Sequence, residues 1–334
     1  MDNQKYDFEK SKINIFFKKY IIYKNKYNKL KNQLAGDNNQ YTQIILSNCI
    51  KKGISYNLRI LNINNCVQIT DEFFIYLKGL QTLYMNNCHK VTDDGIYHLK
   101  DIKILSMSNC RGITNKSLTY LEGIQELDIS YCYQITGSTF KYIRGINKLN
   151  IRNCNKISED SFKFLEGVKI LDISYCYHLS SNLFFYLKEI KELYMRLCNQ
   201  KQIMDKDFVY LETIEKLDIS FCQQLTDNAL LNLKNIKILD ITGCRLITNT
   251  VFLNLKNIQE LYMGFCDQNN ITDDIFNYIP NVKKINIQGC IQLNGNNIVN
   301  LKYLNYLNIK YCDYIIDNYL IYLKKIKDII IITK

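Results

Sequence analysis

Cysteine recurs at a nearly constant interval along most of this 334-residue chain. The interval is 22 residues, except for two steps of 24 residues. The series consists of Cys66, Cys88, Cys110, Cys132, Cys154, Cys176, Cys198, Cys222, Cys244, Cys266, Cys290 and Cys312. A fixed period of this length is typical of stacked-repeat proteins, in which each unit buries its apolar face against its neighbours. The sequence therefore predicts one elongated array rather than two globular domains.

The residues around each cysteine predict the structure of one unit. Leu105 and Met107, ahead of Cys110, have the two-residue period of a β-strand, whereas Leu118 and Leu121 have helical spacing. A hydroxyl residue recurs where a helix N-cap belongs, at Thr70, Thr92, Thr114, Ser158, Thr226, Thr248 and Thr272. We therefore expect an α/β solenoid with one parallel strand per repeat and a short helix behind it.

Two partial matches extend the array beyond the cysteine series. Residues 41–49 fit the strand and cysteine positions, and residues 326–334 fit them with a lysine in the cysteine position. This gives about fourteen strands and an array over 41–334. Residues 10–34 follow an i, i+3/i+4 apolar rhythm among lysines, which predicts an amphipathic helix. We interpret residues 1–40 as a basic N-terminal cap on the open end of the array.

Charge and cysteine content bear on the compartment and the partners. The net charge is +11, of which +7 belongs to residues 1–57, so electrostatic attraction should be concentrated at the N-terminal end. The chain shows no apolar run long enough to cross a membrane and no secretory signal pattern. Without such a signal, thirteen evenly spread cysteines indicate reduced thiols in an intracellular, cytoplasmic protein. The abundance of Asn, Lys, Ile and Tyr fits AT-rich coding DNA, and we expect this bias to account for part of the lysine excess.

The units resemble leucine-rich repeats of the cysteine-containing subfamily. The subfamily pattern of a cysteine followed by Ile-Thr-Asp is nearly intact at 66–71, 88–93 and 222–227. The resemblance implies a curved horseshoe with strands on the concave face and helices on the convex face. Because these repeats are shorter than is usual for the subfamily, the helices should be short.

In this subfamily the repeats are commonly the substrate-receptor half of F-box proteins, which recruit targets to cullin-based ubiquitin ligases. The resemblance therefore implies a ligase adaptor as a partner. The N-terminal segment itself has no Leu-Pro start and no Trp, so an F-box is not recognisable there. A degenerate F-box within 5–52 stays open as the alternative to a simple cap.

A second period predicts which side chains face the concave surface. Six positions before the cysteine, the pattern Ile-Glu-Lys occurs three times, in Ile104, Glu126, Lys148, Ile170, Glu192, Lys216, Ile238, Glu260 and Lys284. This pattern indicates duplication of a three-repeat block. It should place each Glu beside a Lys on the next strand, where duplication alone explains a set of weak exposed ion pairs.

The candidate binding residues lie four, two and one positions before the cysteines. Those four positions before are Tyr84, Asp128, Asp172, Tyr194, Asp218, Asp240 and Tyr262. Those two or one positions before are Tyr131, Arg152, Tyr175, Arg196, Phe221, Phe265 and Tyr311. Aromatic, Arg and Asp side chains on a rigid concave sheet are typical of a protein-binding surface. The alternative is that these rings fold over onto the loops as ordinary surface cover.

No motif indicates catalysis, a cofactor or a metal. The three histidines, His89, His98 and His178, lie in no nucleophile or metal motif. The cysteines occupy one position of successive repeats, so they should form a buried row rather than converge on a tetrahedral zinc site. We expect a non-enzymatic, monomeric scaffold that binds another protein. The rival hypothesis is a basic helix over 10–34 that binds nucleic acid or an acidic membrane surface, although a solvated capping helix explains its lysines as well and disfavours nucleic acid.

Overall fold

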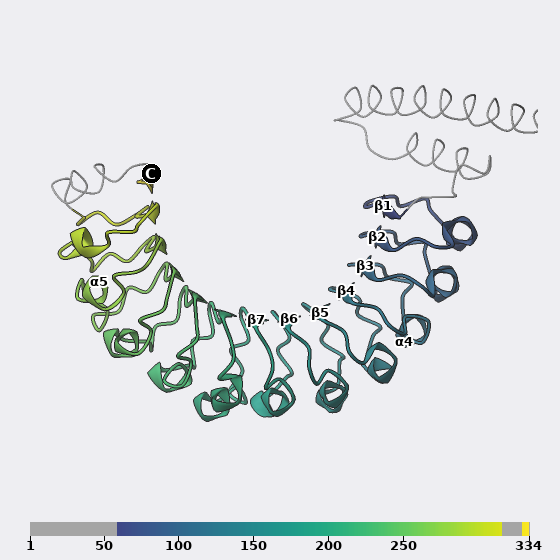
Figure 1. Cartoon of the computed structure of the whole chain (residues 1–334), viewed down its shortest axis with the longest axis horizontal. Coiled ribbons are helices and arrows are strands. Elements are labelled where there is room, and N and C mark those ends of the chain that lie inside the picture. The colour runs from purple at the N-terminus through teal and green to yellow at the C-terminus, as the bar shows by residue number, and fades with distance from the viewer. Residues whose placement is uncertain (1–58, 316–328, 334) are drawn as a thin grey trace, which may run out of the picture. The chain divides into compact units, whose positions relative to one another are not determined.

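The computed structural model describes residues 59–315 and 329–333, and in them every strand belongs to one parallel β-sheet (Figure 1). The chain divides into two compact units, Met1–Ile54 and Ser55–Lys334, and the described residues all belong to the second. Their strands are β1 Ile60–Asn62, β2 Thr82–Tyr84, β3 Ile104–Ser106, β4 Glu126–Asp128, β5 Lys148–Asn150, β6 Ile170–Asp172, β7 Glu192–Tyr194, β8 Lys216–Asp218, β9 Ile238–Asp240, β10 Glu260–Tyr262, β11 Lys284–Asn286, β12 Tyr306–Asn308 and β13 Ile330–Ile332.

The sheet confirms the predicted solenoid. Each strand pairs in parallel with the next one along the chain, and β13 confirms the repeat expected after 326. The fourteenth expected strand, over 41–49, lies outside the described residues. So do the predicted helix over 10–34, the 1–40 cap and the alternative F-box.

A single turn or two of helix follows each strand from β1 to β11, on the opposite side of the repeat. The 3₁₀ helices are η1 Asp71–Leu77, η2 Tyr97–Leu99, η3 Phe140–Ile143, η4 Glu159–Phe164, η5 Ser181–Tyr186, η6 Asp205–Leu211, η7 Asp227–Ala229, η8 Asn249–Leu253 and η9 Ile298–Asn300. The α-helices are α3 Asp93–Ile96, α4 Asn115–Leu118 and α5 Ile275–Tyr278. Within this unit the strands line the inner side of the curve and the helices the outer side (Figure 1). Short helices were predicted from the short repeat, and the structure confirms them.

The core lies between the strands and the helices. Most strands have a buried central residue between two half-buried ones, so the central residue, such as Leu171 in β6, points inward. Phe184 and Phe208, from the helices of consecutive repeats, meet with their ring centroids 5.1 Å apart. Each unit thus buries its apolar residues against the next one.

The cysteines form the predicted internal row. All twelve cysteines from Cys66 to Cys312 are buried, and those from Cys88 onward are free thiols. Each thiol from Cys88 onward lies within hydrogen-bonding distance of a main-chain carbonyl in the preceding repeat, as Cys176 does with Ile151 at 3.3 Å. A thiol is small and a weak donor, so it fills the space and satisfies this carbonyl. Burial raises the pKa of the Cys176 thiol to about 12.

Four of the predicted helix caps are present with an acid one repeat earlier, whereas Thr70 makes no side-chain cap bond and the N-cap of α5 is Asp274 rather than Thr272. The hydroxyls of Thr92, Thr114, Thr226 and Thr248 accept a hydrogen bond from the amide two residues on. Each hydroxyl also donates to a carboxylate one repeat earlier, as Thr92 does to Asp71 at 2.6 Å. Ser158 makes no such cap, and Gly137, which has no side-chain acceptor, occupies the position where those four repeats have Asp. The neighbouring repeat therefore orients the capping hydroxyl.

Candidate functional site

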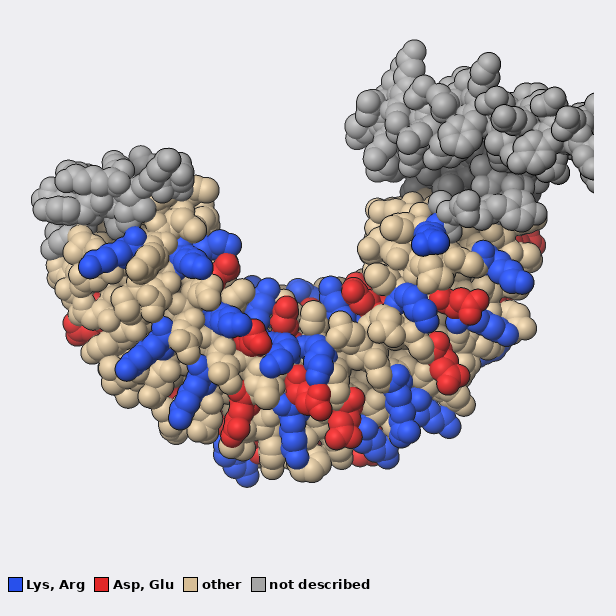
Figure 2. Space-filling view, viewed as in Figure 1, with Lys and Arg blue, Asp and Glu red and all other residues tan. Residues whose placement is uncertain are grey.

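The concave side of the sheet presents the predicted Glu–Lys pairs. The register aligns Glu126 with Lys148, Glu192 with Lys216, and Glu260 with Lys284. The corresponding N–O distances are 3.9, 4.0 and 2.9 Å. All six side chains are partly exposed, so the pairs contribute little stability, and they leave polar groups available to a partner. Lys, Arg, Asp and Glu are likewise interspersed over the face shown in Figure 2.

Two of these pairs also hold a tyrosine. The Tyr194 hydroxyl donates to Glu192 at 2.7 Å, and Lys216 lies 5.0 Å from the centroid of the same ring. The Tyr262 hydroxyl donates to Glu260 at 2.9 Å. Burial and this bond to Glu260 raise the pKa of Tyr262 to about 12. The rings of Tyr194 and Tyr262 are therefore held in place before any partner binds.

The predicted aspartates lie on the same side but shape the turns that follow the strands. Asp128, Asp172, Asp218 and Asp240 each accept a hydrogen bond from the amide two residues on, as Asp240 does from Thr242 at 2.9 Å. Burial raises the pKa of Asp172 and of Asp240, and Asp218 raises both further. These carboxylates are half-buried, so their exposure to a partner is limited.

At Tyr84, Tyr194 and Tyr262 the side chain cannot make that turn. For the first two, the preceding repeat supplies the acceptor instead. The amide of Asn86 donates to Asn64 at 2.8 Å, and that of Arg196 donates to the Ser174 hydroxyl at 3.2 Å. Tyr84 is 37% exposed near the N-terminal end of the sheet. It lies beside a hollow of about 250 Å³ over β3 to β5.

The aromatic residues that precede the cysteines share a left-handed backbone. Tyr131, Tyr175, Phe221, Phe265 and Tyr311 have φ between 58° and 63°. Asn or Gly accepts this conformation readily and fills the position in most other repeats, whereas a bulky residue there is strained. The Arg152 guanidinium lies 4.5 Å from the centroid of the Tyr175 ring, and Arg196 lies 4.8 Å from that of Phe221. The structure thus brings the predicted arginines and aromatics together.

These aromatic residues occur in every second repeat. The sequence analysis listed them but did not identify this alternation. A Cβ built on Gly243 would lie only 2.7 Å from Cδ1 of Phe221, and Gly289 has the same relation to Phe265. Each of these two rings therefore lies over the backbone of the next repeat, where a small residue is needed. This explains the alternation of Phe and Gly from Phe221 to Gly289. Phe265 and Tyr311 are the most exposed of the five rings, at 44% and 56%.

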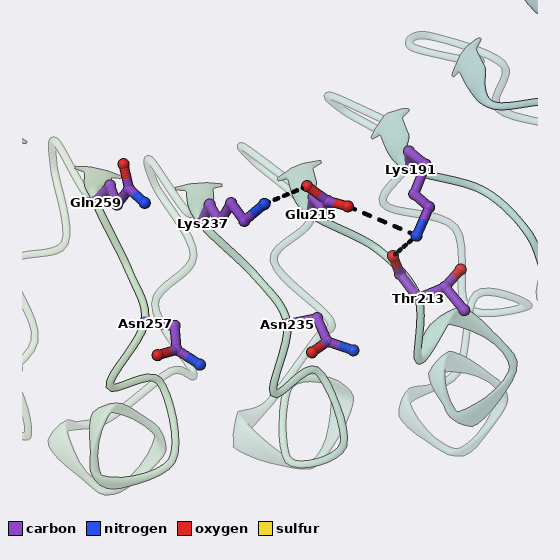
Figure 3. Close-up of a pocket in the computed structure, with 7 residues that line it drawn as sticks. All are labelled: Lys191, Thr213, Glu215, Asn235, Lys237, Asn257 and Gln259. Carbon is purple, nitrogen blue, oxygen red and sulfur yellow. Dashed lines mark hydrogen bonds and ion pairs between the residues drawn. The ribbon is translucent and has the colours of Figure 1, made fainter.

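A polar groove of about 460 Å³ lies where the chain enters the strands, on residues that the sequence analysis did not single out (Figure 3). Glu215 pairs with Lys191 at 3.6 Å and with Lys237 at 2.6 Å, across three repeats. Asn235, Asn257 and Gln259 line the rest of this groove with Thr213. The only feature of the sequence that could have indicated this groove is the recurrence of Lys, Glu and Gln seven positions before the cysteines. Periodicity alone predicts only that these residues lie at the surface.

Three further observations limit the chemistry of the described residues. No group of three or more His, Cys, Asp or Glu side chains within 59–315 and 329–333 could hold a metal ion. His178 contacts the main-chain carbonyl of Ile157 through Nε2 at 2.6 Å, which ties this ring to the preceding repeat. Among the helices that the structure describes, none has the length and apolarity needed to cross a membrane.

Comparison with known proteins places the fold. No family model matches the chain, and no curated protein matches its sequence. A chain in the crystal structure of the Rad7 and Elc1 complex in yeast is similar, with 19% identity and a TM-score of 0.59, over 97% of this chain and 90% of that chain. A chain in the TLR13–ssRNA13 complex has 18% identity and a TM-score of 0.53, over 77% of this chain and 47% of that chain. At these identities the likeness shows the fold alone. That fold is an α/β leucine-rich-repeat solenoid.

Proposed function

We propose that this protein is a non-enzymatic scaffold that binds another protein along its concave face. The observation that favours this most is the pair of braced tyrosines, Tyr194 and Tyr262, each tied to a Glu of its own strand. Tyrosines are frequent energetic centres of protein interfaces. A ring that is ordered before binding loses less conformational entropy when it is covered. The Glu–Lys pairs around these rings add polar groups that fix the orientation of a partner.

A more specific version of this proposal is a substrate receptor for a cullin-type ubiquitin ligase inside the cell. Its support is the cysteine-containing repeat pattern, together with a fold that covers nearly the full length of a chain found in a two-protein complex. In this version the array holds the substrate, and Met1–Ile54 contacts an adaptor. The rival is a basic N-terminal helix that binds nucleic acid or an acidic membrane surface.

The test is quantitative affinity purification of the full chain from its native host. The concave variant replaces both Tyr194 and Tyr262 with Ala. The matched control replaces Tyr142 and Tyr210, which lie on the outer helices and are 37% and 36% exposed. The proposal expects a partner that the concave variant loses at least about tenfold and the control retains, because each central ring contributes on the order of 1–2 kcal/mol or more. If the concave variant retained every partner of the parent protein, binding by this face would be refuted.

The same experiment separates the narrower versions. A ligase receptor expects an adaptor and a cullin among the recovered proteins, and it expects both to disappear when only Ser55–Lys334 is used. Their absence with the full chain would remove the ligase version and leave the scaffold. If the basic N-terminal helix is the binding element, capture should fall steeply as salt is raised, and deletion of Met1–Ile54 should be enough to abolish it.

A further inference from the structure

One rim of the array is free of acidic residues over nine repeats. This carboxyl-end rim is the set of loops that follow the strands, at 64–70, 86–92, 108–114, 130–136, 152–158, 174–180, 196–204, 220–226 and 242–248. These loops contain no Asp and no Glu, in a chain with 32 of them. They contain seven basic residues, Lys90, Arg111, Arg152, Lys156, Arg196, Lys201 and Arg245. Five of the nine loops therefore carry positive charge and the other four are uncharged, whereas the concave face mixes both signs.

These basic groups are also largely unpaired. Of the seven, Arg245 pairs with Asp267 at 3.3 Å, and the other six make no ion pair with a described carboxylate. On the opposite rim, by contrast, Lys191 and Lys237 share Glu215. Arg152 interacts electrostatically with Asp172, and Arg196 does so with Asp240, so attraction of an anionic partner falls mainly to Lys90, Arg111, Lys156 and Lys201. The sequence analysis assigned such attraction to residues 1–57 because the repeats together add only +4.

Two exposed tyrosines stand within this rim. Tyr133 and Tyr177 are 47% and 48% exposed. Each is held edge-on by a half-buried neighbour, with centroid distances of 6.5 Å from Tyr131 and 6.3 Å from Tyr175. Because they are two repeats apart, the exposed rings are separated by about 10 Å. Arg152 belongs to the repeat between them and stacks on Tyr175.

The two supporting tyrosines have the left-handed backbone that the residue before the cysteine adopts in every repeat from 65 to 311, so the repeat itself imposes this conformation. Tyr131 and Tyr175 have φ of 59° and 62°, and Asn153, between them, has the same conformation at lower cost. Asn153 also donates to the Tyr133 hydroxyl at 3.1 Å, which fixes that ring further.

We propose that the carboxyl-end rim, centred on Tyr133, Arg152 and Tyr177, binds single-stranded nucleic acid. The bases stack on the two exposed rings, and the phosphates contact Arg152, Lys156 and the flanking cations. A single strand offers both a π-face and a negative charge at every residue, which matches rings alternating with unpaired cations. A duplex hides its base faces and fits less well. This activity goes beyond the proposed scaffold and uses a different surface of the array.

The experiment measures binding of labelled 15-nucleotide U-rich RNA and T-rich DNA strands to the full chain by fluorescence anisotropy. The ring variant is Tyr133→Ala with Tyr177→Ala, and its control is Tyr142→Ala with Tyr210→Ala. We expect the ring variant to bind at least about tenfold more weakly, since one stacked base is worth roughly 5- to 100-fold. Lys156→Gln should lower the slope of log affinity against log salt by about 0.7, whereas Lys163→Gln on η4 should leave the slope unchanged.

Two results would overturn the proposal. One is equal oligonucleotide binding by the parent, the ring variant and the control, which would assign binding to residues outside the rim. The other is that a poly-glutamate peptide binds the parent as tightly as the oligonucleotide does, and that the ring variant weakens its binding by the same factor. The rim would then be a docking surface for an acidic protein segment. The melting temperature of each variant is compared with that of the parent. A variant that melts as the parent does has lost binding and not folding.

Discussion

The carboxylate of Asp93 in one repeat accepts two hydrogen bonds from Thr114 in the next, at 2.9 Å from the amide and 2.6 Å from the hydroxyl. The same carboxylate accepts from the amide and the hydroxyl of Ser117. Four donors of one repeat thus depend on one buried acid of its neighbour. The Asp of the recurring Ile-Thr-Asp pattern therefore joins consecutive repeats, in addition to beginning its own helix.

Replacing Asp93 with Ala should destabilise the array by roughly 2–3 kcal/mol, because it leaves buried donors of the next repeat without an acceptor. Asp94→Ala is the matched control. Its side chain is 75% exposed and pairs only with Lys116, so the expected loss is below about 1 kcal/mol. Urea denaturation followed by circular dichroism measures both values. Equal losses would show that the link between repeats is not energetically important.

Cys176→Asp should destabilise the array by about 3–5 kcal/mol, because it buries a charge without a partner. Cys176→Ala should cost only about 1 kcal/mol, since it removes one sulfur atom and a weak hydrogen bond. Thermal unfolding of the two variants compares the same site. An Asp variant that melted with the parent would place the cysteine row on the surface.

The buried thiols should resist modification while the array is folded. Burial raises the pKa of Cys110 and of Cys132 to about 12, so at pH 8 only about one thiol in ten thousand is a reactive thiolate. We expect a thiol-specific reagent to label these positions only at denaturant concentrations that unfold the array. Peptide mapping by mass spectrometry identifies the labelled sites. Rapid labelling of either cysteine in the native protein would contradict this expectation.

Asp240→Asn should make the array more stable at neutral pH. Burial and the nearby Asp218 raise the pKa of Asp240 in the folded state, so the folded chain binds this proton more tightly than the unfolded chain. Stability therefore falls as pH rises through the interval between the ordinary and the raised pKa, and the loss persists above it. Asn keeps the turn, as Asn150 and Asn286 show in other repeats. The advantage of the variant should disappear once the pH is below both pKa values.

The reciprocal variant is Asn150→Asp, which places a third acid between Asp128 and Asp172 on adjacent strands. We expect it to lower the urea midpoint at pH 7 more than at pH 4. A midpoint difference independent of pH in both variants would show that charge burial at this row does not govern stability.

Periodicity was sufficient to predict the solenoid and the strand register. The spacing from Glu192 to Lys216 already implied that they lie side by side, because parallel strands in register align equivalent positions. The buried cysteine row followed from the same argument. Local spacing also identified the capping threonines, although not the carboxylates that orient them.

Features that depend on the path of a loop or on contact between repeats were not accessible from one sequence. The left-handed backbone at Tyr131 and Tyr175 follows from how the chain leaves the strand, and periodicity does not encode a dihedral angle. The hydrogen bond from Asp240 to the following turn is a local contact. The recurrence of aspartate at this position, taken alone, is equally compatible with a row of partner-binding residues. The acid-free loops could have been found from the sequence, because they occupy the same positions relative to each cysteine, but the sequence analysis counted charge by segment and not by repeat position.

The most direct test of the concave-face account is lysine acetylation footprinting of the full chain, with and without its captured partner. Lys148, Lys216 and Lys284 project from the concave strands, whereas Lys163 and Lys188 belong to the outer side of the array. The account predicts that the partner slows acetylation of the concave lysines at least severalfold and leaves Lys163 and Lys188 unchanged. Protection of the outer lysines with full reactivity at Lys216 would contradict it.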